Sequence, residues 1–253
     1  MNIVALILSV LFGVQEPAKT ESRLPPPEDV LSGMPLEYLI GTSAVQYGRD
    51  GRLTEVAYDV DMLPSLGIGV GYVNLFDENN TGKYGPYLHE SDTAVEYGEG
   101  QIDPSGAGWE KNLIEQFRRR QKAGFRYIEL DNPDAYKASA VNGAVSRATE
   151  FGLRVLAKNP VICDDPESYL AHANVYGAIV EKGAGTPRQM EELRRKVGRP
   201  NLPVWFVYFG STSATALEAA RTIRENGYRN MGVTFSSRTE YGSSQDVYLP
   251  VKP

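Results

Sequence analysis

The chain has 253 residues, of which 42% are hydrophobic, and its formal net charge is −6 at pH 7. This length suits one large α/β domain or two small domains, and the hydrophobic fraction suffices for a core. The acidic balance argues against nucleic acid as a partner, and against an anionic membrane as a partner of the mature form, whereas it tolerates a neutral or cationic ligand.

Cysteine and histidine are scarce. Cys163 is the single cysteine, and His89 and His172 are the two histidines of the sequence. One cysteine excludes an internal disulfide and a thiolate metal site, and so few histidines disfavour a zinc enzyme or a Ser-His-Asp hydrolase. We therefore expect no metal and no cofactor, and we interpret these three residues as ordinary packing or surface residues.

The first residues of the sequence predict export. The apolar run from Ile3 to Phe12 is too short to span a bilayer but suits the core of a secretory signal, although no Lys or Arg precedes it. We expect residues 1–15 to be a signal peptide, residues 16–35 to be a Pro-rich linker and residues 36–253 to be one folded domain. A secreted or periplasmic protein follows, with a misassigned start as the alternative.

Eight strand-like runs follow the linker, and helix-like runs accompany the last five of them. This alternation predicts parallel pairing with right-handed crossovers, and eight strands predict an α/β fold of the (β/α)8 TIM-barrel type. The basic run Arg118-Arg119-Arg120 is interpreted as the solvated side of its helix. The strands are expected at Glu37–Thr42, Thr54–Asp61, Ile68–Leu75, Tyr127–Asp131, Leu153–Lys158, Gly177–Glu181, Val204–Phe209 and Asn230–Phe235.

The first third of the barrel is expected to be irregular. The segment Leu63–Gly67, between the second and third strands, is too short for a crossover helix. Residues 77–105, rich in Gly, Asn, Asp and Tyr, are too long for a routine connector and predict an active-site loop. Gly67, Gly69 and Gly71 do not form a dinucleotide fingerprint, and we interpret them as small residues that let a strand pack closely.

Charged and amide side chains follow the predicted strands at the point where each strand ends. Asp131 and Asn132 end one strand, Lys158 and Asn159 the next, and Glu181 the one after. Catalytic groups of a parallel barrel lie at this C-terminal face. Two carboxylates on separate strands meet the need of glycoside hydrolysis, because one attacks or guides water and the other protonates the leaving oxygen.

Three further residues are candidate sugar-binding groups: Tyr72, Tyr208 at another strand end, and Glu240 beyond the last strand. Two of the strand-end residues also have a structural interpretation. Asp131 could cap the helix that follows, although Asp134 stands in the better capping position. Lys158 could form an ion pair with Glu129 or Asp131 inside the barrel mouth.

The motifs from Trp109 to Glu181 are similar to those of a known family. The chain resembles the endo-α-1,4-polygalactosaminidase barrels, glycoside hydrolase family 114, over roughly residues 36–236. Two departures are that Lys182 and Gly183 follow Glu181 where the family usually has Gln and Cys, and that the family's cysteines are missing. The resemblance is carried by Trp109 and its amphipathic helix, Ala123-Gly124-Phe125, Leu130-Asp131-Asn132-Pro133-Asp134-Ala135-Tyr136, Gly152-Leu153, Ala157-Lys158-Asn159 and Val180-Glu181.

The resemblance implies a retaining glycosidase acting on a polysaccharide or oligosaccharide, with a galactosamine-containing polymer as the substrate. It implies Asp131 as nucleophile and Glu181 as general acid/base, with Asn132, Lys158 and Asn159 binding and orienting the sugar. Unlike surroundings should keep the first carboxyl ionised beside its cation and the second protonated at the end of an apolar run.

Two other functions stay open at this point, as do the linkage, endo or exo cleavage and the oligomeric state. Lys158 could instead be the Schiff-base nucleophile of an aldolase-type enzyme. Alternatively, a secreted barrel could bind a polysaccharide without cutting it. The aromatic residues available for such binding are Tyr72, Tyr84, Tyr87, Tyr97 and Trp109.

Overall fold

The computed structural model describes residues 31–40, 51–57, 63–64, 67–75, 93–96, 99–102, 104–209, 213–236 and 249–250. The predicted signal peptide, most of the predicted linker and Glu240 lie outside these residues. The strands are β1 (Leu36–Ile40), β2 (Leu53–Ala57), β3 (Ile68–Asn74), β4 (Thr93–Glu96), β5 (Glu99–Ile102), β6 (Tyr127–Asp131), β7 (Arg154–Lys158), β8 (Val175–Glu181), β9 (Val204–Phe209), β10 (Met231–Ser236) and β11 (Leu249–Pro250).

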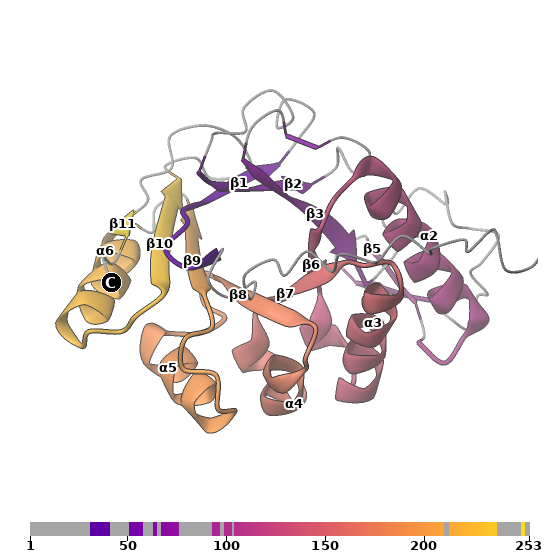
Figure 1. The fold of residues 1–253 in the computed structure, drawn as a ribbon. Coiled ribbons are helices and arrows are strands. Elements are labelled where there is room, and N and C mark those ends of the chain that lie inside the picture. The colour runs from indigo at the N-terminus through magenta and orange to yellow at the C-terminus, as the bar shows by residue number, and fades with distance from the viewer. Residues whose placement is uncertain are drawn as a thin grey trace, which may run out of the picture.

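The main sheet follows the order β1-β2-β3-β6-β7-β8-β9-β10-β11, and β4 and β5 pair as a separate antiparallel hairpin within the segment predicted to be an active-site loop. Along this order, neighbouring strands from β1 to β10 pair in parallel, and these eight strands correspond to the predicted ones in the predicted order. The bounds of β6 and β9 are those predicted, and the other six differ at one or both ends. The sheet is curled as in an α/β barrel (Figure 1).

The first and last parallel strands of the curled sheet, β1 and β10, approach each other. Thr234 on β10 donates a hydrogen bond from Oγ1 to the carbonyl oxygen of Leu36 on β1, at 2.9 Å. The short strand β11 pairs antiparallel with β10 at Gly232 and Val233. Among the described residues, the side chain of Thr234 therefore links β10 to β1.

The helices α2 to α6 lie outside the curled sheet (Figure 1). Their inner faces and the outward side chains of the strands share one apolar core, which includes Phe117, Ile128 and Leu130. Side chains of opposite parity, such as Leu156 and Ile179, form a second core inside the sheet. No helix of the described part is long and apolar enough to cross a membrane. The helices are α2 (Ala107–Ala123), α3 (Ala138–Glu150), α4 (Pro166–Ala171), α5 (Pro187–Lys196) and α6 (Ser213–Glu225).

The glycines of β3 allow close packing, as predicted. A Cβ atom added to Gly69 would lie 2.7 Å from Cδ of Pro64, and one added to Gly71 would lie 2.8 Å from Cγ of Arg120. Both separations are too short for real side chains, so only glycine fits without a shift of its neighbours. Most residues between β1, β2 and β3 lie outside the described part of the chain, so the predicted irregularity of this part stays a prediction.

Arg120 corrects the interpretation of the basic run on α2. The side chain of Arg118 is 59% exposed, as expected of a solvated face, but Arg120 is fully buried. Its Nε donates to the carbonyl oxygen of Tyr72 at 2.8 Å, and a terminal guanidinium nitrogen donates to the same oxygen. A buried guanidinium needs such acceptors, so Arg120 ties α2 to β3.

The last residues of the predicted linker contact the barrel strands. Leu31 is fully buried in the inner core, and the indole nitrogen of Trp205 donates to the carbonyl oxygen of Met34 at 2.8 Å. Ser32 Oγ also donates to Asn230 Oδ1 at 2.6 Å. Residues 31–35 of the predicted linker therefore pack against the N-terminal ends of β9 and β10.

Candidate active site

The strand ends β6, β7 and β8 bring three charged side chains to one place. Leu156 and Ile179 belong to the inner core, so Lys158 and Glu181, two residues further along their strands, point to the same interior. Asp131 holds the corresponding position at the end of β6. The prediction that these three residues gather at the C-terminal end of the sheet is therefore confirmed by their contacts.

Lys158 contacts three carboxylates. Its Nζ lies 2.6 Å from Glu129 Oε1, 3.1 Å from Glu181 Oε1 and 3.7 Å from Asp131 Oδ1. The side chains of Lys158 and Glu129 are 1% and 0% exposed, whereas those of Asp131 and Glu181 are 21% and 26% exposed. The buried salt bridge between Lys158 and Glu129 thus forms the floor of the site. Asp131 and Glu181, the rim carboxylates, are partly exposed to solvent.

Tyr72 on β3 binds the first rim carboxylate. Its Oη donates a hydrogen bond of 2.6 Å to Asp131 Oδ2. Burial raises the pKa of Tyr72 well above its ordinary value, and the charge of Asp131 raises it further. The phenol therefore stays protonated at neutral pH and remains a donor to the carboxylate.

Two asparagines hold the rim carboxylates. Asn132 and Asn159 adopt the left-handed conformation, with φ of 59° and 45°, before the short 3-10 helices η5 (Pro133–Ala135) and η6 (Pro160–Ile162). Asn159 Oδ1 accepts from the backbone N–H of Glu181 at 2.8 Å, and Asn159 Nδ2 donates to Glu181 Oε2 at 3.4 Å. Asn132 Nδ2 donates to Asp131 Oδ2 at 3.4 Å. Each amide thus fixes a carboxylate.

A buried polar network beneath the site escaped the sequence reasoning. Asn132 Nδ2 also donates to Asn74 Oδ1 at 2.8 Å. The backbone N–H of Asn74 donates to Gln116 Oε1 at 3.0 Å, and Gln116 Nε2 donates to the carbonyl oxygen of Asn74 at 2.7 Å. Asn112, Gln116 and Arg120 are spaced by four residues along α2 and are all buried. This i, i+4 spacing is the signal that could have revealed a polar stripe facing the sheet.

One predicted sugar-binding residue, Tyr208, does not join the cluster. Tyr208 packs in the outer core between the sheet and the helices, is 4% exposed, and burial raises its pKa. The interior face of β9 carries Trp205 and Val207 instead. The structure therefore does not bring Tyr208 to the rim carboxylates, and Glu240 lies outside the described residues.

The alternative of Asp131 as a helix cap is not supported. Its side-chain oxygens contact Tyr72, Asn132 and Lys158, and the 3-10 helix that follows has Asn132 at its N-cap, with no side-chain capping bond.

Within the described residues, no group of three or more His, Cys, Asp or Glu side chains is arranged to hold a metal ion.

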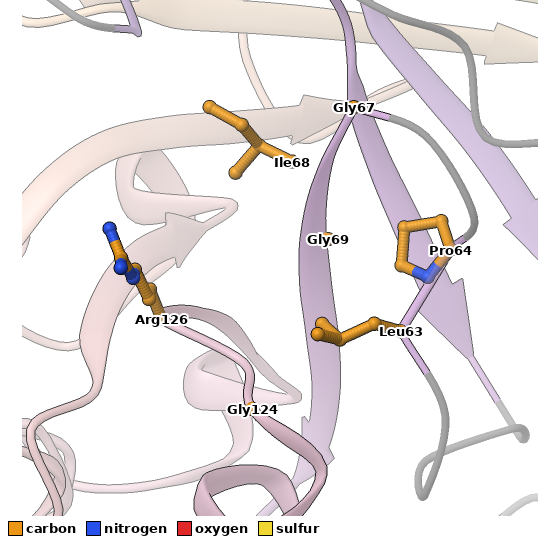
Figure 2. Close-up of a pocket in the computed structure, with 7 residues that line it drawn as sticks. All are labelled: Leu63, Pro64, Gly67, Ile68, Gly69, Gly124 and Arg126. Atoms are coloured by element: carbon orange, nitrogen blue, oxygen red, sulfur yellow. The ribbon is translucent and has the colours of Figure 1, made fainter.

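A hollow of about 240 Å³ lies at the other end of the sheet (Figure 2). It includes Ile68, at the start of β3, and Arg126, which precedes β6. It is lined by Leu63, Pro64, Gly67, Ile68, Gly69, Gly124 and Arg126. The rim carboxylates lie at the opposite ends of these strands, so this hollow is separate from the candidate active site.

The protein thus has a curled α/β sheet of the barrel type, with two partly exposed carboxylates around a buried lysine. No protein-family model and no curated protein sequence matches the chain. Among solved structures, the chain is similar to Ega3 of Aspergillus fumigatus in complex with galactosamine, at 12% identity over 85% of this chain and 96% of that chain, with a TM-score of 0.61.

The chain is also similar to the glycoside hydrolase domain of PelA from Pseudomonas aeruginosa. The identity is 11% over 84% of this chain and 97% of that domain, with a TM-score of 0.58. Likeness at such low identity establishes a shared fold. The resemblance predicted from the sequence is therefore confirmed at the level of the fold.

Proposed function

We propose that the protein is a glycoside hydrolase that cleaves a polysaccharide with Asp131 and Glu181. The observation that carries the proposal is that two partly exposed carboxylates from different strands contact one buried ammonium, Lys158 Nζ. Glycoside hydrolysis uses such a pair on either side of the scissile bond. The fold shared with solved glycoside hydrolases supports the same conclusion.

The spacing of the two carboxylates favours a retaining mechanism. Asp131 Oδ1 and Glu181 Oε1 lie 3.7 Å and 3.1 Å from the same nitrogen. Their separation is therefore at most about 6.8 Å, which admits the roughly 5–5.5 Å of retaining enzymes and only the shortest inverting separations.

The roles follow from the contacts of each carboxylate. Asp131 is the nucleophile, since Tyr72 and Asn132 hold its Oδ2 while Oδ1 makes only a longer, 3.7 Å contact to Lys158. Its oxygen bonds to the anomeric carbon as the glycosidic bond breaks, and Glu181 gives its proton to the leaving oxygen. Glu181 then takes a proton from water, which displaces Asp131 and restores both groups.

The charge of the cluster suits a cationic sugar. Three carboxylates surround one ammonium, so the ionised site carries an excess of negative charge that attracts a protonated amine. Ega3 is described in complex with galactosamine, and a galactosamine-containing polymer is the substrate class we propose here.

Two further parts of the proposal concern the whole chain. The hydrogen bond from Thr234 to Leu36 supports closure of the curled sheet into a complete (β/α)8 barrel. The apolar run Ile3–Phe12 supports export of the protein.

A panel of polymers tests the proposed function. The protein is incubated with acetylated and deacetylated galactosamine polymers, chitosan and neutral glycans, and the products are identified by mass spectrometry. We expect oligosaccharides from a galactosamine polymer, and an intact polymer would contradict the proposal. Binding without products would instead favour the non-catalytic polysaccharide-binding barrel.

The aldolase alternative is disfavoured by the state of its lysine. A Schiff-base lysine must lose its proton and reach the substrate. Lys158 is 1% exposed and contacts three carboxylates, which stabilise the ammonium form. Absence of borohydride trapping with carbonyl substrates is the expected result.

A further inference from the structure

Glu129 lies beneath the proposed catalytic pair and has no role in the mechanism given above. It is on β6, two residues before Asp131, and its side chain is fully buried. Its Oε1 makes the shortest of the three carboxylate contacts with Lys158 Nζ, 2.6 Å against 3.1 Å for Glu181 and 3.7 Å for Asp131. The buried lysine is therefore shared between a floor carboxylate and two rim carboxylates.

This sharing determines the charge that each rim carboxyl experiences. A cation within about 4–6 Å favours the ionised form of a carboxyl, and a like charge favours the protonated form. The negative charge of Glu129 offsets the positive charge of Lys158. The net charge that the floor presents to Asp131 and Glu181 is therefore smaller than that of the ammonium alone.

The other titratable groups around the floor stay neutral. Tyr72 faces the cluster from β3, and Tyr169 faces it from α4, where it is 1% exposed. Burial is the largest cause that raises the pKa of each phenol well above its ordinary value, and the charge of Glu129 raises both further. The charges that change in the acidic and neutral range are therefore those of the carboxyls.

We infer that Glu129 is a positioning residue that acts through Lys158. It limits how much of the ammonium charge reaches Asp131 and Glu181, and so sets the pH range in which one rim carboxyl attacks while the other donates a proton. The inference rests on the proposed glycosidase function of the same site.

Two variants that remove opposite charges from the buried pair Glu129 and Lys158 provide the test. Glu129→Gln keeps the shape and removes the negative charge, so both limbs of the pH profile of kcat/KM should move to lower pH by about one unit. Lys158→Met removes the positive charge, so both limbs should move to higher pH. Limbs that stay in place in Glu129→Gln while activity falls would show a merely structural role and overturn the inference.

A double variant isolates the coupling and protects the test against misfolding. Glu129→Gln combined with Lys158→Met leaves no charge at the floor, so its limbs should lie between those of the single variants and close to those of the wild type. Limbs equal to those of Glu129→Gln alone would overturn the inference, because removal of Lys158 would then have no effect on the rim carboxyls. Glu150→Gln, an exposed residue on α3, is the control and should leave the limbs unmoved.

A second readout does not depend on activity. Carbon-13 carboxyl titrations of Asp131 and Glu181 should show the same opposite shifts in the two single variants, with the signals assigned by their loss in Asp131→Asn and Glu181→Gln. If the wild type cleaves none of the glycans but the carboxyl titrations of the two single variants shift as expected, the proposed function is refuted and the charge coupling stands. Carboxyls that do not respond to Glu129→Gln would refute the coupling itself.

Discussion

Tyr72 on β3 donates a 2.6 Å hydrogen bond to Asp131 on the neighbouring strand β6. The bond places a neutral donor on the oxygen that faces away from Lys158, so the proposed nucleophile is held from two sides. Short hydrogen bonds to a carboxylate are stronger than hydrogen bonds between neutral groups, and they also fix the orientation of the carboxylate.

Tyr72→Phe should reduce kcat/KM roughly 10- to 100-fold, since one hydrogen bond to a charged group is worth about 1.5–3 kcal/mol. Tyr176→Phe is the matched control, as Tyr176 stacks on Arg154 near the other ends of the strands. Unchanged kinetics in Tyr72→Phe would show that the bond has no part in catalysis.

Asn159→Gly should lower kcat roughly 10- to 100-fold while the protein stays folded. Glycine tolerates the left-handed conformation of this position, so the variant mainly removes the two hydrogen bonds to Glu181. Asn230→Gly is the control, because Asn230 is also left-handed but precedes β10 at the other end of the sheet. Equal losses of activity in both variants would point to a general effect on folding.

Arg120→Met should lower the free energy of unfolding by about 2–4 kcal/mol, because the buried carbonyl oxygen of Tyr72 loses its guanidinium donor. The exposed Arg118→Met should change it by less than about 0.5 kcal/mol. Urea denaturation measures both values. Similar stabilities of the two variants would contradict the structural role assigned to Arg120.

His172 should make the stability of the fold depend on pH. Its Nδ1 accepts a hydrogen bond from the backbone N–H of Asn174 at 3.1 Å, and desolvation followed by the charge of Arg199 lowers its pKa. The folded state therefore binds the proton more weakly than the unfolded state. This contribution is fully present above the unfolded pKa of about 6.5 and is lost as the pH falls through the lower folded value. Between pH 7.5 and pH 5, the urea denaturation midpoint of His172→Gln should fall less than that of the wild type. An equal fall in the two proteins would refute this role of His172.

The sequence predicts the strands and the rim carboxylates for the same physical reason. Alternation along β6, β7 and β8 places charged residues on one face at the strand ends, and parallel pairing then brings those ends together. Tyr208 could not be assigned in this way, because every residue of β9 from Val204 to Phe209 is apolar or aromatic and no pattern distinguishes its two faces.

Tertiary contacts account for the rest of what sequence reasoning missed. Arg120 belongs to a basic run, and only the carbonyl oxygen of Tyr72 on β3 explains its burial. Leu31 follows a Pro-rich stretch, and its segment packs because Trp205, far along the chain, binds Met34. Local composition carries no information about such distant partners.

The decisive measurement for the role of Asp131 is the release of reducing ends from a galactosamine polymer. The rate of the wild-type protein is compared with that of Asp131→Asn. We expect steady release by the wild type and a loss of at least about 1000-fold in Asp131→Asn, with unchanged folding and polymer binding. The exposed control Asp134→Asn should release reducing ends at nearly the wild-type rate. Substantial release by Asp131→Asn would contradict the assignment of Asp131 as the nucleophile.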